Sequence, residues 1–170
     1  MCLNVTAENT YASKAKETIV CYKVLKCKEM PDGKTALLSW FRDFPYELGK
    51  TYTEDKFVDH VLFGVEVGFH SYAEEKSAKA DASIYNWGSH DVIVRCEIPK
   101  GTQYFIGRYS IWKSYCSKSI KLTGIKYYRG YEKEWDAEWT EPEVKKSKPN
   151  IFKRLFCGLI KKIIRWILLK

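Results

Sequence analysis

The sequence predicts an α+β fold, a strand-rich single domain followed by a C-terminal basic amphipathic helix. Three observations support this fold class. β-Branched and aromatic residues gather in short runs bounded by Gly and Pro, as they do in β-strands. One internal run, 73–87, is rich in helix formers instead. The segment 150–170 combines large apolar residues with Lys and Arg at helical spacing.

The expected strands follow from the runs that turn residues bound. The first, at 18–27, is dense in β-branched and aromatic residues and ends before the turn sequence at 31–33. The other extended segments, in chain order, are 36–41, 68–71, 92–98, 103–106 and 119–128. A loop rich in Ser, Lys and Tyr is expected between the last two, and 54–63 fits no single period.

The internal helix has start and stop signals of its own. Glu74 and Glu75 supply acids to its first turn, and Gly88 ends it. With this helix the chain divides into four expected parts. These are a flexible N-terminus at 1–17, an α+β globular domain at 18–128, an acidic-to-basic linker at 129–149, and the amphipathic helix at 150–170.

Charge is segregated along the chain. The whole sequence has 29 Lys and Arg against 21 Asp and Glu, and nine of the basic residues but none of the acids lie in 144–170. The preceding residues carry 20 basic and 21 acidic groups and are close to neutral. The basic balance is therefore no evidence that the domain itself binds nucleic acid, and nucleic acid is not an expected partner.

On a helix, the segment 150–170 separates into two faces. The residues expected to insert into a membrane are Phe152, Phe156, Leu159, Ile163, Trp166 and Ile167. The residues expected to bind lipid headgroups are Lys153, Arg154, Lys161, Lys162 and Arg165. A helix lying in the interface keeps its cations among anionic headgroups, each worth about 1 kcal/mol. The expected partner is thus an anionic membrane surface.

Other roles for this helix remain open. A spanning helix would place Lys161, Lys162 and Arg165 in the bilayer at about 2.5–3.5 kcal/mol each, which disfavours it. The helix can instead dock on its own domain with its cations in solvent, enter a groove of a partner protein or self-associate. A cationic amphipathic segment can also permeabilise membranes.

The N-terminal sequence and the cysteines favour an intracellular protein. No basic region followed by an apolar run begins the chain, so no secretory signal is expected. The six cysteines form no C-x-x-C pair, which favours reduced thiols at core positions. Cys2 and Cys157 are possible acylation sites. The expected location is cytoplasmic, peripheral on the inner face of a membrane.

Few residues point to catalysis or to a cofactor. His60, His70 and His90 have no metal-ligand spacing with the cysteines, and no Gly-rich phosphate loop is present, so neither a metal nor a cofactor is expected. The aromatic residues near 40–52 form either the core of a strand-rich domain or the wall of a ligand pocket. A ligand cleft, if present, is expected beside Lys23, His70 and Ser71.

A set of short motifs carries a resemblance. In order they are YKVL at 22–25, YELGK at 46–50, GFHS at 68–71, EIPKG at 97–101 and SKSIKL at 117–122. Together they resemble an uncharacterised family of small phage and bacterial domains, and they are more distantly similar to the ADP-ribosyltransferase fold. The resemblance covers about 21–125 and implies a cleft that binds NAD.

Compared with that fold, the site is degenerate. The resemblance places Lys23 where the transferases carry an Arg, and an ammonium lacks the planar fork that pairs with pyrophosphate. Ser71 matches the strand serine. The catalytic Glu would fall near Ser119, where a hydroxyl cannot supply its charge. The sequence therefore predicts a non-enzymatic interaction protein held at a membrane, and an NAD-dependent transferase is the alternative.

Overall fold

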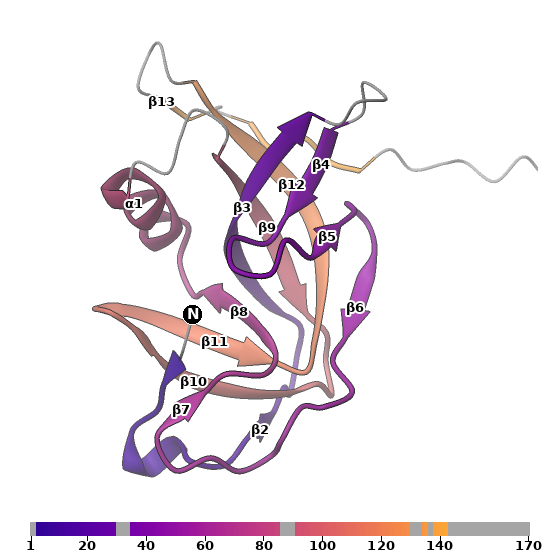
Figure 1. Cartoon of the computed structure of the whole chain (residues 1–170). Helices are drawn as coiled ribbons and strands as arrows, with labels where there is room; N and C mark the ends of the chain where they lie inside the picture. Colours follow the sequence, from indigo (N-terminus) through magenta and orange to yellow (C-terminus); the bar gives the residue numbers. More distant parts are fainter. Residues whose placement is uncertain (1–2, 30–34, 86–90, 130–133, 136–137, 143–170) are drawn as a thin grey trace, which may run out of the picture.

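The computed structural model describes residues 3–29, 35–85, 91–129, 134–135 and 138–142 (Figure 1). Within them lie one α-helix, α1 (Glu75–Tyr85), and one 3-10 helix, η1 (Ala7–Asn9). The strands are β1 (Leu3–Asn4), β2 (Ser13–Lys14), β3 (Ile19–Glu29), β4 (Thr35–Leu38), β5 (Pro45–Tyr46), β6 (Thr51–Thr53), β7 (Gly64–Val65), β8 (Phe69–Tyr72), β9 (Asp91–Ile98), β10 (Gln103–Tyr109), β11 (Trp112–Ser117), β12 (Ser119–Arg129) and β13 (Glu134–Trp135).

The strands form one antiparallel sheet in the order β13-β12-β9-β3-β8-β11-β10-β1-β7. On its outer parts, β2 pairs with β10, β4 with β3, and β6 with β12. Figure 1 shows α1 beside β3 and β8, with β10 and β11 crossing below the long central strands. The strand-rich α+β class is therefore confirmed. The predicted helix at 150–170 lies outside the described residues.

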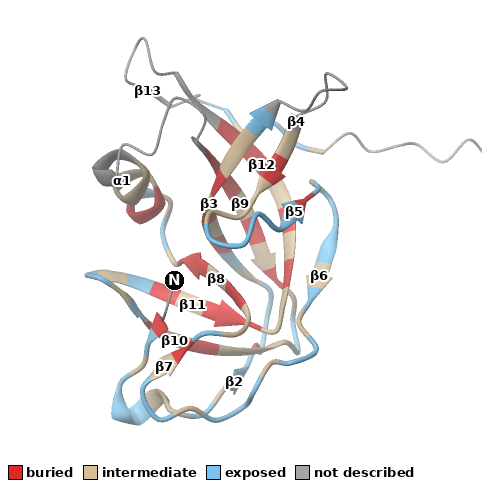
Figure 2. Ribbon diagram, in the orientation of Figure 1, coloured by how far each residue is buried: buried red, intermediate tan, exposed pale blue. Residues whose placement is uncertain are grey.

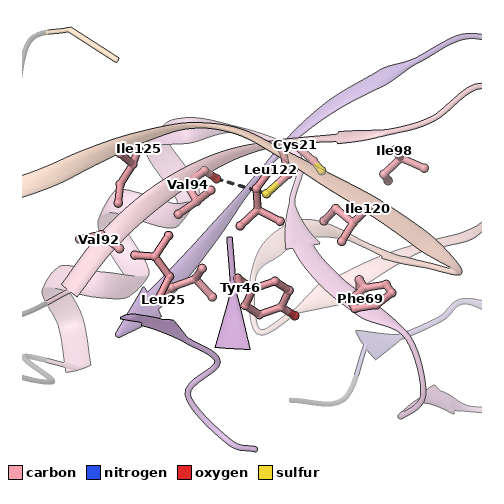
Figure 3. Close-up of a cluster of buried hydrophobic side chains, with 12 residues drawn as sticks. Cys21, Leu25, Tyr46, Phe69, Val92, Val94, Ile98, Ile120, Leu122 and Ile125 are labelled. Carbon is pink, nitrogen blue, oxygen red and sulfur yellow. Dashed lines mark hydrogen bonds between the residues drawn. The ribbon is translucent and has the colours of Figure 1, made fainter. Parts of the chain in front are cut away.

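Three long strands form the centre of the sheet, and the sequence predicts all three. β3 and β9 pair over eight positions, with Cys21 opposite Cys96, and β12 pairs on the other side of β9. Their β-branched residues suit a sheet covered on both faces. Leu25, Val94 and Leu122 come from the three strands and are buried in one cluster (Figure 3).

The core extends from this cluster to the lower strands. Figure 2 shows buried residues along β9 and β12 and again along β8, β10 and β11. Phe69 on β8 and Tyr46 on β5 belong to the same cluster as the central strands (Figure 3). Burial raises the pKa of the Cys21 thiol to about 11, so this cysteine acts as a small apolar residue.

Two segments in which no strand was expected contain strands. β11 occupies part of the stretch between the last two predicted strands, because Ser114 and Cys116 alternate inward and are buried. A tight turn joins it to β10, with Ser110 at a φ of 53°. The aromatic stretch 44–52 contains the short strand β5 and the start of β6. The segment 54–63 joins the fold through the bridge between Tyr11 and His60 and through backbone hydrogen bonds such as that from the Val5 amide to the Phe63 carbonyl.

Residues 3–17 are part of the fold, unlike the flexible N-terminus that the sequence led us to expect. β1 pairs with β10 and β7, and Leu3 is 1% exposed in a core cluster with Phe105. Gly107 on β10 permits this approach, because a Cβ there would lie 2.2 Å from the carbonyl oxygen of Asn4. The segment is mostly polar, so its sequence did not indicate the strand β1, which depends on one buried apolar side chain, that of Leu3.

The segment 138–142, which we name the strap, corrects part of the expected linker. Thr140 exchanges two backbone hydrogen bonds of 2.9 Å with Ile125 on β12. The Trp139 ring lies 5.9 Å from the Tyr22 ring, and Glu141 forms an ion pair with Arg95. Glu141, one of the acids of the predicted linker, therefore contacts the sheet.

Candidate functional site

A pocket of about 470 Å³ lies where β3 meets β8. The chain segments around it are β3, the loop from β4 to β5, the end of β6, the residues leading into β8, and α1. The lining residues that bear charge or aromatic rings are Lys23, Trp40, Phe41, Arg42, Phe44, Tyr46, Glu54, Glu66, Phe69, His70, Tyr72, Asp81 and Tyr109. A volume of this size suits a small organic ligand.

Lys23 is the buried cation of this pocket. Its side chain shares the core-facing side of β3 with Cys21 and Leu25, and the residue is 9% exposed. The ammonium donates a hydrogen bond to the backbone carbonyl of His70 and lies 5.6 Å from the centre of the Tyr46 ring. Within the described residues no carboxylate pairs with Lys23.

His70 lies beside Lys23 and is held neutral. Its Nε2 is 3.4 Å from the carbonyl oxygen of Glu66 and 3.7 Å from the Cys116 Sγ. Because the carbonyl can only accept, the ring proton belongs on Nε2. Burial, with the Lys23 charge as a second cause, lowers the pKa of His70 to about 4. Gly68 makes room here, because a Cβ would lie 2.6 Å from that sulfur.

Aromatic rings form one wall and part of the rim. Tyr46 packs edge-on against Phe44 at 5.0 Å and against Phe69 at 6.5 Å. Tyr46 is 7% exposed, whereas Phe44 and Phe41 are 41% and 59% exposed. The aromatic-rich stretch therefore serves both roles that the sequence left open, since Tyr46 belongs to the core and also lines the pocket.

The loop that carries these rings is fastened to β3. The amide of Ser39 donates to the Phe44 carbonyl at 2.9 Å, and the amide of Phe44 donates to the Ser39 hydroxyl at 3.0 Å. Lys26 on β3 forms a 2.9 Å ion pair with Asp43 and lies 5.0 Å from the Trp40 ring centre. These contacts hold the rim in a defined position relative to Lys23.

The carboxylates of the pocket are engaged elsewhere or face solvent. Burial raises the pKa of Asp81 on α1, and a hydrogen bond from the Tyr72 hydroxyl opposes that shift. Glu54 accepts a 3.1 Å hydrogen bond from the amide of Lys56. Glu66 is exposed. Each of the three residues lines the pocket, but none of them forms an ion pair with Lys23.

α1 is fixed to the sheet, which places Asp81. Glu75 in its first turn pairs with Lys79 at 2.7 Å and with Lys126 on β12 at 3.1 Å. The Lys126 ammonium also lies 4.6 Å from the centre of the Trp139 ring. The strap, the sheet and the helix thus share one set of contacts on the face away from the pocket's aromatic wall.

The structure brings two of the three predicted cleft residues together. Lys23 and His70 line the pocket, whereas Ser71 is buried at 2% exposure and does not line it. Ser119, the position of the transferase Glu, lies 2.9 Å from the Thr53 hydroxyl and does not line the pocket. The residues that the transferase resemblance would gather around NAD are therefore not gathered here.

Several lining residues were not predicted from the sequence. Arg42, Glu54, Glu66 and Asp81 stand in no motif, and their approach to Lys23 comes from the folding of distant segments. The signal that was available is the position of Arg42 inside an aromatic-rich loop. A charged residue there, flanked by exposed rings, favours a binding surface over a core.

The predicted membrane-binding residues, 152–167, lie outside the described residues. Among the described residues, no helix has the length and apolarity that a membrane crossing requires. The same part of the chain contains no group of three or more His, Cys, Asp or Glu that could hold a metal ion.

No family model, curated protein or solved structure matches this chain. The resemblance to a phage and bacterial domain family, and to the ADP-ribosyltransferase fold, stays a prediction.

Proposed function

We propose that this chain is an interaction protein whose domain is held at an anionic membrane surface by its C-terminal basic amphipathic segment. The observation that carries the proposal is the segregation in 150–170, where apolar residues and cations separate at helical spacing and acids are absent. The domain contributes a binding pocket rather than a gathered catalytic set. It acts by bringing what it binds to the membrane.

The strap sets how far the domain sits from the lipid. It is hydrogen-bonded to β12 as far as Thr140, and the described chain ends at Pro142. Seven residues, 143–149, then precede the predicted helix. A fully extended chain of that length reaches about 25 Å. A tether this short holds the domain close to the headgroups.

The proposal predicts binding that depends on anionic lipid, on salt and on the apolar face. The full chain should co-sediment with vesicles of phosphatidylcholine and phosphatidylserine at low salt, and less with phosphatidylcholine alone. Phe156→Glu with Ile163→Glu should move the protein to the supernatant, because two carboxylates cannot enter the acyl boundary.

A matched control separates this face from apolar exposure in general. Leu62 and Ile111 are 69% and 70% exposed on the domain, so Leu62→Glu with Ile111→Glu adds the same charge elsewhere. This variant should still sediment with the vesicles. If the tail variant stays bound, or if the control is released equally, the proposal is wrong. Release of an entrapped dye would identify membrane permeabilisation instead of tethering.

A further inference from the structure

The pocket contains a buried cation, Lys23, with which no carboxylate of the described residues forms an ion pair. Lys23 is 9% exposed, points from the core face of β3, and has one hydrogen-bond acceptor, the His70 carbonyl. An ammonium has three donors, and burying it without a counter-charge costs free energy. An imidazole cannot supply a negative charge, and because burial lowers the pKa of His70 to about 4, this ring adds no second cation either.

The charges around the pocket restrict the ligand to a small negative charge. Three carboxylates line it, from Glu54, Glu66 and Asp81, and they would repel a dianion such as a phosphate monoester. Arg42, the second cation of the lining, is exposed at the rim. One buried ammonium suits one carboxylate.

The shape of the pocket restricts the rest of the ligand. Tyr46 and Phe69 lie at the Lys23 end, and the partly exposed Phe41 and Phe44 lie at the rim. Aromatic rings in this arrangement favour a flat apolar body by stacking and by burial. The volume of about 470 Å³ is within the range of small-molecule sites, roughly 300–1,000 Å³.

We propose that this pocket binds a small organic monocarboxylate with a flat apolar body, its carboxylate on Lys23 and its body against the aromatic rings. The ligand completes the pairing of the buried ammonium and fills the space under the loop at 39–44. This inference concerns the domain and does not depend on the membrane proposal.

A matched pair of probes tests the carboxylate. Titration calorimetry of the full chain should show 2-naphthoate binding at least tenfold more tightly than 2-naphthamide, which has the same ring system without the charge. A hydrogen bond to a charged group is worth about 1.5–3 kcal/mol, which corresponds to roughly tenfold to over a hundredfold in affinity. 2-Naphthyl phosphate should bind more weakly than the carboxylate.

Variants then locate the binding. Lys23→Met keeps the length of the side chain and should abolish the preference for the acid, whereas Lys23→Arg should retain part of it. Lys113→Met on β11 removes an exposed lysine away from the pocket and should change nothing. The tail is the same in all of these proteins, so any loss belongs to the pocket.

Three results would overturn the proposal. One is the absence of measurable naphthoate binding at millimolar concentration, and another is equal affinity for the acid and the amide. The third is an unchanged preference in Lys23→Met. The acid-to-amide comparison uses the unaltered chain, so it decides even if a variant fails to fold.

Discussion

Replacing Trp139 tests whether the strap is an integral part of the domain. A buried Trp replaced by Ala costs about 3–5 kcal/mol, and Trp139 is half-buried, so roughly half of that is expected. The rings of Trp139 and Tyr22 lie 5.9 Å apart, and cation–π contacts from Arg95 and Lys126 add about 0.5–1 kcal/mol each. Trp139→Ala should therefore lower the free energy of unfolding by about 2.5–4.5 kcal/mol.

The assay is urea unfolding followed by far-ultraviolet circular dichroism, since removing a Trp alters fluorescence. Trp139→Phe keeps a ring over Lys126 and should lose less than half as much. Glu138→Ala, at an exposed neighbour, should stay within about 0.5 kcal/mol of the unaltered chain. If Trp139→Ala also stays within that margin, 138–142 is a linker after all, and the short tether inferred from it fails.

Two further stability predictions concern the N-terminus and His70. Leu3→Ala should cost about 2–5 kcal/mol in urea unfolding, because Leu3 is 1% exposed and fills a core cluster, while Glu8→Ala should cost almost nothing. A cost below 1 kcal/mol for Leu3→Ala would return this segment to a flexible N-terminus. The pKa of His70 is lowered from 6.5 to about 4, so the unfolded chain binds the extra proton between these values. The contribution of neutral His70 to the free energy of unfolding is fully present above pH 6.5 and is lost as the pH falls through 4. The full loss is up to about 3 kcal/mol. His70→Gln should flatten that part of the profile, and an unchanged slope between pH 4 and 6.5 would contradict the assignment.

The sequence predicted the elements whose local pattern is strong. β3, β9 and β12 follow runs of β-branched and aromatic residues, and α1 (Glu75–Tyr85) lies within the run of helix formers at 73–87. In each of these, the neighbours along the chain already favour the conformation that the sheet requires. Local propensity and tertiary packing agree there, so a single sequence is enough.

The N-terminus and the strap were missed because their partners are distant in the sequence. Leu3 needs β10, and its strand can approach only because Gly107 has no side chain. Trp139 needs Tyr22 and Arg95, which lie on the central strands. A polar segment with one buried apolar side chain has the sequence pattern of a loop, because the residues that bury this side chain are distant in the sequence.

The pocket was predicted in part for a similar reason. Lys23 and His70 stood out as charged or titratable groups in strand-like surroundings, whereas Arg42 and Asp81 reach the pocket from a loop and a helix. Ser71 stood next to His70 in a motif, and adjacent residues of a strand point to opposite faces. The GFHS motif therefore identified the correct strand, β8. Of its two predicted pocket residues, His70 lines the pocket and Ser71 does not.

The place of Lys23 within its strand is the feature of the molecule that most favours a bound ligand. On the core face of β3 the sequence runs from Cys21 through Lys23 to Leu25, and the two flanking side chains are 0% and 1% exposed. An apolar residue at 23 would suit the sheet better, because it would bury no charge. Lys23 is a charged residue at a core position, and no carboxylate of the described chain pairs with it. Such a residue is expected where function, rather than stability, determines its identity. A bound anion would neutralise the Lys23 ammonium, and the aromatic rings of the lining favour an anion with a flat apolar body.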